Sequence, residues 1–104
     1  MDILIKGIGI DGIYVKASGR LDLDNAVEYG TKIKDAIEES VEAITNVTLD
    51  FSEIDFISSF GLKVVLELYK QLKAQNGVLK LKSVSEQLMN SFKIVGFDKF
   101  LLFE

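Results

Sequence analysis

The sequence contains 104 residues, of which 48% are hydrophobic and 27% are charged, and its formal net charge at pH 7 is −4. Cysteine and histidine are both absent, which excludes disulfides, thiolate nucleophiles, a Ser-His-Asp triad and most transition-metal sites. The length suits one hydrophobic core, so we expect a single domain over residues 1–104, and the acidic balance with dispersed lysines argues against nucleic acid as a direct partner.

The N-terminal residues predict an antiparallel hairpin. Residues 3–10 are rich in isoleucine and leucine, and residues 13–18 form a second apolar run of strand length. The Asp11-Gly12 pair between the two runs suits a tight turn that needs a positive φ. The first two strands are therefore expected to be neighbours in the sheet.

A helix is expected to follow the hairpin. Residues 19–24 break the strand pattern, and the carboxylate of either Asp22 or Asp24 can cap the helix N-terminus. Gly30 lies inside the predicted helix and weakens its helical propensity. The apolar side of this helix is predicted to consist of Val27, Ile33 and Ile37.

A short strand and a long amphipathic helix are predicted next. Residues 47–51 are mostly β-branched, aliphatic or aromatic, which favours a strand, and a helical period begins at about Ser59. The Asn76-Gly77 pair supplies a left-handed stop at the end of this helix. Its predicted apolar stripe is Leu62, Val65, Leu66, Tyr69 and Leu72, and its predicted solvent side is Lys63, Glu67, Lys70 and Lys73.

The C-terminal part predicts a strand, a third helix and a final short strand. Residues 78–82 alternate apolar and polar side chains, as a half-buried strand does. Ser85 is the expected N-cap of the third helix, and Gly96 ends it. Residues 100–103 form the last strand. The apolar positions of the third helix are Leu88, Met89, Phe92 and Ile94.

The resulting element order, ββαβαβαβ, predicts an α/β fold. The later strand–helix–strand units require right-handed crossovers between parallel strands. We therefore expect a mixed, mostly parallel β-sheet, with the N-terminal hairpin as its antiparallel part and the helices packed on it.

Three sequence blocks stand out when they are taken in order along the chain. The first is Gly19-Arg20-Leu21-Asp22, at the start of the first helix. The second combines Asp50-Phe51-Ser52 and Phe56-Ile57 with Ser58-Ser59-Phe60-Gly61-Leu62, and the third is Gly96-Phe97-Asp98-Lys99-Phe100. Together these blocks resemble the STAS domain of the bacterial anti-sigma factor antagonists, the anti-anti-sigma factors, nearly from end to end. The resemblance implies the STAS fold.

The resemblance also implies a regulatory binding protein that is switched by phosphorylation. In such antagonists a serine at the start of a helix is phosphorylated by a partner anti-sigma factor that is a serine protein kinase, and by position that serine is Ser59. The unmodified form binds the anti-sigma factor, and the phosphorylated form does not. The residues expected at the partner-binding surface are Asp22, Ser58, Ser59, Phe60 and Gly61.

A helix N-terminus is a favourable place for a phosphate. Phosphorylation adds about −1.5 to −2 charges at pH 7, and the positive end of the helix dipole with its free backbone N–H groups stabilises an anion there. Modification of Ser59 would therefore change the docking surface while the fold survives. The simpler interpretation is that Ser58 and Ser59 only cap the helix.

Two departures from the usual family pattern keep a second hypothesis open. Ser58 stands where these antagonists usually have aspartate, and Phe60 stands where they usually have a small hydroxyl residue. The alternative function is a STAS scaffold or interaction module of a multi-protein signalling complex that is not phosphorylated. Stable multimers would favour the scaffold, whereas a monomer or weak homodimer, which we expect, favours the antagonist. Phe60 could pack under a loop or stand out as an apolar anchor for a partner.

An enzymatic function is not expected. Ser59 has no histidine to activate it, and Lys63, one turn later, would need a desolvated environment to act as a base. Asp50 and Asp55 do not supply the several converging oxygens that a divalent cation needs. The sequence therefore predicts no catalytic residue, no metal site and no cofactor.

Two features of the sequence bear on location. No apolar run approaches the roughly 18 residues of a membrane-spanning helix. Asp2 stands where a secretory signal needs basic residues. We therefore expect a soluble cytoplasmic protein whose partner is another protein rather than a membrane.

Phe56 and Ile57, which lead into the second predicted helix, are expected to lie in the hydrophobic core of the domain.

Overall fold

The computed structural model describes residues 1–41 and 43–104. These residues form one five-stranded sheet with the order β1-β2-β3-β4-β5, in which β1 pairs antiparallel with β2 and the later pairs are parallel. The predicted element order and the mixed, mostly parallel sheet are therefore confirmed. The strands are β1 (Asp2–Ile8), β2 (Gly12–Leu21), β3 (Asn46–Ile57), β4 (Val78–Lys82) and β5 (Leu102–Phe103).

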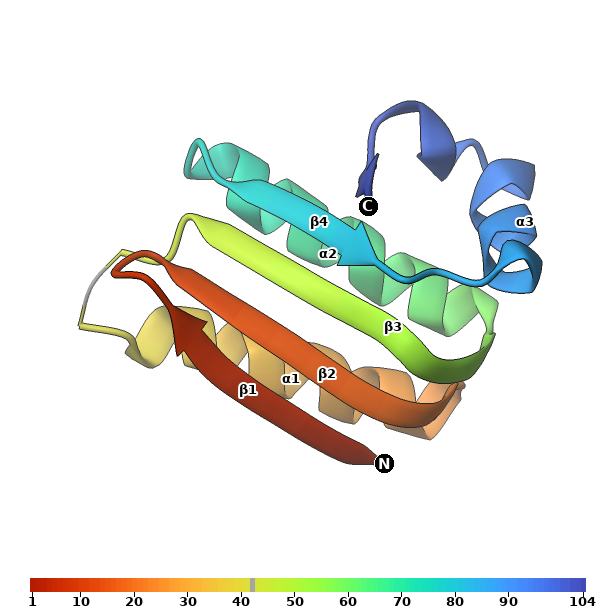
Figure 1. The fold of residues 1–104 in the computed structure, drawn as a ribbon, viewed down its shortest axis with the longest axis horizontal. Helices are drawn as coiled ribbons and strands as arrows, with labels where there is room; N and C mark the ends of the chain where they lie inside the picture. Colours follow the sequence, from red (N-terminus) through yellow and green to blue (C-terminus); the bar gives the residue numbers. More distant parts are fainter. Residues whose placement is uncertain (42) are drawn as a thin grey trace.

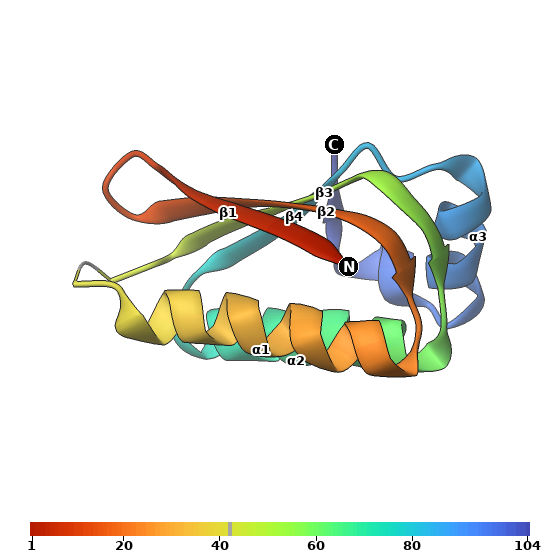
Figure 2. The ribbon, with the colours of Figure 1, turned by 90° about the horizontal axis from the view of Figure 1, so that it is seen from below.

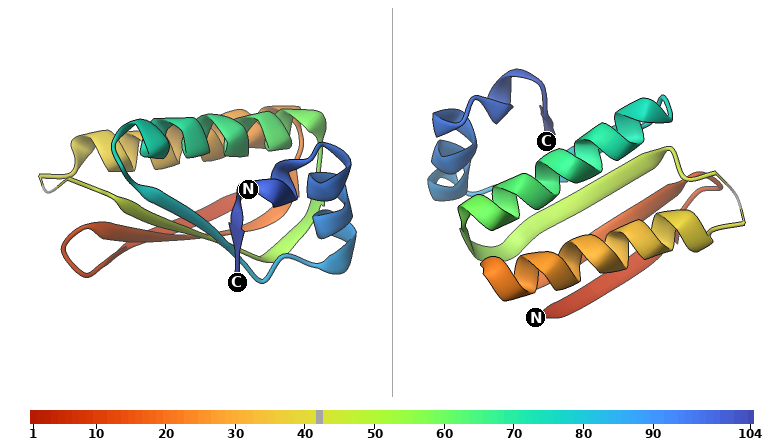
Figure 3. Two further views of the ribbon diagram at one scale, coloured as in Figure 1. Left: turned by 90° about the horizontal axis from the view of Figure 1, so that it is seen from above. Right: turned by 180° about the vertical axis from the view of Figure 1, so that it is seen from behind.

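Two long helices cover one face of the sheet (Figure 1). α1 (Leu23–Glu39) and α2 (Ser59–Ala74) lie side by side and begin at the same end of the sheet (Figure 3). α3 (Glu86–Ile94) and a single turn of 3₁₀ helix, η1 (Phe97–Lys99), lie at that same end. Among the described residues, no helix covers the opposite face, which we call the open face (Figure 2).

The core lies between the sheet and the two long helices. Val15, Leu49 and Leu81, from three neighbouring strands, are fully buried on the covered face. Because successive side chains of a strand point to opposite faces, the residues between them lie on the open face. The helices contribute Ala26, Tyr29, Ile33 and Ile37 from α1 and Leu62, Val65, Leu68 and Leu72 from α2.

The predicted apolar stripes were wrong at two positions. Val27 is 61% exposed, because the buried side of α1 includes Ala26 and the next residue of a helix is rotated by about 100°. Ile94 is 84% exposed, because Phe92 lies on the buried side of α3 and two further residues turn the side chain away. In α2 the stripe is confirmed at Leu62, Val65 and Leu72, is only partly buried at Leu66 and Tyr69, and also includes Leu68.

The hairpin turn lies earlier in the chain than predicted. β1 ends at Ile8, the turn spans residues 9–11, and the positive φ of +66° belongs to Gly9 rather than to Gly12. Gly12 instead opens β2, where a Cβ atom would lie 2.7 Å from the carbonyl oxygen of Ile8. The placement of the turn at Asp11-Gly12 was therefore wrong, and Gly12 is required by a close approach of two backbones.

Two strands are longer than predicted and one is shorter. β2 continues through Gly19, whose φ is +112°, and reaches Leu21 with register shifts against β3. β3 continues past residue 51 to Ile57. The last strand is only Leu102–Phe103, and Phe100 lies in the turn before it. Bulges allow the central strands to keep pairing beyond the residues whose side-chain pattern marks a strand.

The helix ends follow the predicted signals. Ser85 caps α3, because its hydroxyl accepts a hydrogen bond from the backbone N–H of Leu88 at 3.2 Å. Asn76, with φ +59°, is the left-handed residue after α2, and Gly96, with φ +79°, follows α3. These local signals therefore identify where the helices begin and end.

A nearly buried carboxylate lies in the middle of the open face. Asp50 is 6% exposed and accepts hydrogen bonds from the Tyr14 hydroxyl and, at 2.8 Å, from the backbone N–H of Ser52. Burial opposes ionisation of Asp50, but these hydrogen bonds and the charge of Lys16 outweigh it and lower the pKa of Asp50 below its ordinary value of 3.8. The same contact raises the pKa of Tyr14, because its hydroxyl proton is held by the carboxylate.

We expect Tyr14→Phe to lower the free energy of unfolding by about 1.5–3 kcal/mol at neutral pH, because a hydrogen bond to a charged group is lost. A carboxyl whose pKa is lower in the folded state stabilises the fold fully above its unfolded pKa, and this contribution disappears as the pH falls through the folded pKa. Urea unfolding between about pH 2 and pH 7 should show that Tyr14→Phe loses less stability on acidification than the wild type. Identical acid dependence of the two proteins would contradict this coupling.

Candidate functional site

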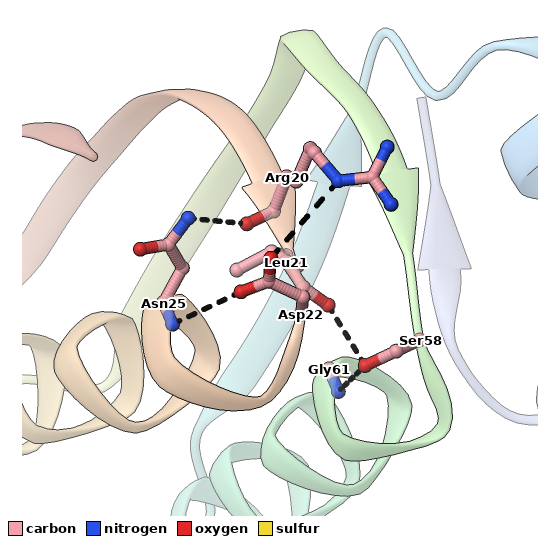
Figure 4. A network of polar contacts seen from close by, with 6 residues as sticks. All are labelled: Arg20, Leu21, Asp22, Asn25, Ser58 and Gly61. Atoms are coloured by element: carbon pink, nitrogen blue, oxygen red, sulfur yellow. Dashed lines mark hydrogen bonds and ion pairs between the residues drawn. The ribbon is translucent and has the colours of Figure 1, made fainter.

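The first turns of α1 and α2 meet at one end of the sheet (Figure 4). β2 and β3 stay paired as far as Leu21 and Ile57, so the two strands end together. The carbonyl oxygen of Leu21 accepts two hydrogen bonds from Ser58, one from its backbone N–H at 3.0 Å and one from its hydroxyl at 3.0 Å. These two hydrogen bonds join the end of β2 to the start of α2. The N-termini of α1 and α2 therefore lie on one surface.

Ser58 is the N-cap of α2. Its hydroxyl accepts a hydrogen bond from the backbone N–H of Gly61 at 3.3 Å while it donates to the carbonyl oxygen of Leu21. The capping interpretation is therefore confirmed for Ser58. Because both interactions use its one hydroxyl, this side chain holds the junction together.

Ser59 is the first residue of α2 and is exposed. The first N–H groups of a helix have no partner within it, and the cap by Ser58 reaches only the N–H of Gly61. An oxygen on the Ser59 side chain therefore lies at the positive end of the α2 dipole. This combination of access and positive potential distinguishes Ser59 from its neighbour.

Asp22, rather than Asp24, is the N-cap of α1. Its carboxylate accepts a hydrogen bond from the backbone N–H of Asn25 at 3.3 Å, and the Asn25 side-chain amide donates to the carbonyl oxygen of Arg20 at 2.8 Å. Nε of Arg20 lies 4.0 Å from the Asp22 carboxylate. The end of β2 and the N-cap of α1 therefore present one basic and one acidic side chain beside the start of α2 (Figure 4).

Arg20 is a site residue to which sequence reasoning assigned no role. Its guanidinium lies over the ring of Phe56, 4.1 Å from the ring centroid, which is a cation–π arrangement. Phe56 is only partly buried, whereas Ile57 is buried. The predicted core position is therefore confirmed for Ile57. Phe56 is buried only in part, and its ring contacts the guanidinium of Arg20.

Gly61 and Phe60 occupy opposite environments in the first turn of α2. Gly61 is buried, and a Cβ atom on it would lie 2.7 Å from the carbonyl oxygen of Leu21 and 2.7 Å from Cγ1 of Ile57. Gly61 therefore permits the close approach of helix and strand and offers no side chain to a partner. Phe60 is 49% exposed, so its side chain is available for contact.

An exposed apolar pair on α1 extends this surface. Leu23 and Val27 are separated by four residues and are both exposed, so they lie on one side of the helix. Val27 and Val64 line a groove between α1 and α2, and Phe60 lies one turn before Val64. The sequence contains a signal for this exposed pair. Leu23 and Val27 are apolar, but the helical period places them on a different side of α1 from its buried residues.

The acidic residues that the structure describes do not assemble into a metal site. Among the described residues, no group of three or more Asp and Glu side chains could hold a metal ion. Asp50 is engaged by Tyr14, and Asp55 is exposed on β3. In the same part of the chain, no helix has both the length and the apolar character needed to cross a membrane.

We expect Gly61→Ala to lower the free energy of unfolding by about 1–3 kcal/mol, because the added methyl group collides with the backbone of β2. Ser59→Ala is the matched control, since Ser59 is an exposed neighbour and its replacement should change stability by no more than about 0.5 kcal/mol. Urea unfolding of the three proteins measures both effects. Equal stability of Gly61→Ala and the wild type would show that the junction can open without cost.

Comparison with known proteins places this geometry in a family. The sequence pattern of the STAS domain matches residues 5–104. BtrV of Bordetella bronchiseptica, which is described as a candidate anti-sigma factor antagonist, is 32% identical over 89 residues, or 85% of this chain and 74% of that protein. The anti-sigma-B factor antagonist of Bacillus subtilis is 29% identical over 84 residues, or 81% of this chain and 73% of that protein.

The fold is also similar to that of the anti-sigma factor antagonist SpoIIAA. The unphosphorylated form has a TM-score of 0.78 at 20% identity and covers 99% of this chain and 87% of its own. The phosphorylated form, from Bacillus, has a TM-score of 0.76 at 21% identity and covers 99% of this chain and 91% of its own. Since the family pattern spans nearly all of the chain and the sheet and helices agree with this fold, the protein belongs to the STAS domain family.

Proposed function

We propose that this protein is an anti-sigma factor antagonist that binds an anti-sigma factor with serine kinase activity and is released by phosphorylation of Ser59. The observation that supports it most directly is the position of Ser59, which is exposed at the first residue of α2. The similarity to curated anti-sigma factor antagonists supports the same class of partner. The protein acts by binding, and no residue of it is proposed to be catalytic.

The two neighbouring serines have different roles in this proposal. The hydroxyl of Ser58 is engaged by Leu21 and Gly61, so phosphorylation there would break both contacts. The exposed hydroxyl of Ser59 can enter a kinase active site while these contacts persist. Ser59 is therefore the acceptor, and Ser58 positions it.

The partner-binding surface combines the first turns of both helices. Phe60 supplies an apolar contact, and Leu23 and Val27 extend it along α1. Asp22 and Arg20 add charged groups at the edge of the apolar surface. Gly61 contributes by shape, because it lets α2 start close to β2.

A phosphate on Ser59 would disrupt binding without unfolding the protein. The α2 dipole stabilises the added negative charge, so the domain remains folded. The same charge stands beside the exposed ring of Phe60, where a partner's apolar side chain would have to bury it without compensation. Loss of binding therefore follows from desolvation at the interface.

The alternative proposal is an unphosphorylated scaffold. It is favoured by Ser58, because the family's usual aspartate is absent and the serine is used as a cap. Lys63 is exposed, which gives no support to a serine–lysine pair with hydrolytic activity. A monomer or weak homodimer is the expected state of the antagonist, and a stable multimer is the expected state of the scaffold.

We expect one phosphate on the wild type after incubation with ATP and the anti-sigma kinases of its organism. Intact mass should show the same single phosphate on Ser58→Ala and none on Ser59→Ala, because of these two serines only Ser59 has a hydroxyl that the junction does not engage. Binding of the phosphorylated form to the kinase should be weaker by about tenfold or more, which corresponds to about 1.4 kcal/mol.

Circular dichroism of Ser59→Ala would verify that the variant is folded. A phosphate that persists in Ser59→Ala would show that another residue is the acceptor. A wild type that binds these partners stably but stays unmodified would favour the scaffold over the phosphorylation switch.

A further inference from the structure

On the open face of the sheet, side chains of neighbouring strands lie in regular rows. Residues paired across neighbouring strands share a face, and Figure 2 shows this face on the side away from α1 and α2. Two rows cross it in register. The first row is Leu4, Lys16, Asp50 and Lys82, and the second is Lys6, Tyr14, Thr48, Lys80 and Leu102.

The charge of these rows is opposite to that of the whole chain. The chain has a formal net charge of −4, yet the two rows hold four lysines and one carboxylate. That carboxylate, Asp50, is nearly buried and is satisfied by Tyr14 and Ser52. Glu104 lies 3.9 Å from the ammonium group of Lys80. The remaining lysines, Lys6, Lys16 and Lys82, therefore make the middle of this face positive.

The lysines surround an aromatic ring that is held in place. The hydroxyl of Tyr14 donates to Asp50 on the next strand. The ammonium groups of Lys6 and Lys82, from strands on either side, lie 5.4 Å and 5.8 Å from the centroid of the Tyr14 ring. In the described part of the chain, the ion pairs involve the N-terminal amine, Arg20 and Lys80. Lys6 and Lys82 are therefore open to an external anion, whereas the charge of Lys16 acts on Asp50.

Apolar side chains lie at both ends of the rows. Leu4 is 62% exposed and Leu102 is 52% exposed, and they belong to opposite edges of the sheet. Asp2 and Glu53 flank Ser18 in the row beyond Leu4 and Lys16 and limit the positive surface on that side. The surface is therefore basic in the middle, apolar at two edges and acidic along one border.

We propose that this surface, the lysine face (Lys6, Tyr14, Lys16, Lys80 and Lys82), binds an acidic amphipathic segment of a protein partner. Carboxylates of the segment contact the lysines, and its apolar side chains contact Leu4 and Leu102. The lysine face lies on the sheet side opposite α1 and α2 (Figure 2), so it provides a second contact surface that does not involve Ser59.

A protein segment fits this surface better than another polyanion. The single arginine of the chain, Arg20, is at the helix N-termini and not on the lysine face, although arginine is the side chain best suited to phosphate. Exposed leucines beside lysines match a partner that alternates carboxylate and apolar side chains.

The test uses a synthetic amphipathic peptide of glutamate and leucine at helical spacing as the probe. Amide chemical shifts of the ¹⁵N-labelled full chain report where it binds and how tightly. The control peptide replaces glutamate by glutamine, and a single-stranded DNA oligonucleotide and phosphatidylglycerol vesicles test the other anions. Lys6→Gln/Lys82→Gln removes two lysines of the lysine face, and Lys63→Gln/Lys70→Gln is the matched control on α2.

We expect the glutamate peptide to shift amides of β1, β2 and β4 and to bind about five- to tenfold more weakly to Lys6→Gln/Lys82→Gln. The affinity for Lys63→Gln/Lys70→Gln should equal that of the wild type, and added salt should weaken binding. Equal affinity for the glutamine peptide, an equal loss in the α2 variant, or tighter binding of DNA or vesicles would each overturn the proposal. Both double variants replace exposed side chains, and their dispersed amide spectra would verify folding.

Discussion

The candidate site depends on the pair of hydrogen bonds that the Leu21 carbonyl oxygen accepts from Ser58. They join the last residue of β2 to the N-cap of α2, and the same hydroxyl then satisfies the N–H of Gly61. Gly61 makes this possible, since any Cβ atom would strike the backbone of β2. The two helix N-termini are therefore held side by side by contacts of Ser58 and Gly61, and none of these contacts uses the Ser59 side chain. In the proposed switch, a phosphate on Ser59 would alter what the surface binds and leave these contacts in place.

The serine at position 58 changes the chemistry of the junction relative to the aspartate that the family usually has there. An aspartate can accept the N–H of Gly61, but an ionised carboxylate has no proton to donate to the carbonyl oxygen of Leu21. Ser58 does both. Serine therefore makes a contact with Leu21 that an ionised aspartate could not make, and its engaged hydroxyl lies next to the exposed hydroxyl of Ser59.

The sheet separates two kinds of surface. Its covered face is apolar and packs on α1 and α2, whereas its open face is polar and is organised around the contact between Tyr14 and Asp50. Parallel sheets are usually covered on both faces and read as continuous apolar strands. Here the central strands alternate, and lysines occupy the positions that would otherwise be apolar. The open face is thus compatible with water, and the lysines in its middle suit a partner of opposite sign.

The sequence by itself determined the features that depend on neighbours in the chain. The order of strands and helices follows from hydrophobic period, and the ends of helices follow from Asp22, Ser58, Ser85 and Asn76, because a cap acts on residues three or four positions away. The tertiary structure alone decided which apolar residues of α1 reach solvent, as Val27 does, and that the left-handed turn residue is Gly9. It also decided that Tyr14 meets Asp50 and that Arg20 lies on Phe56, because such contacts join residues that only strand pairing brings together.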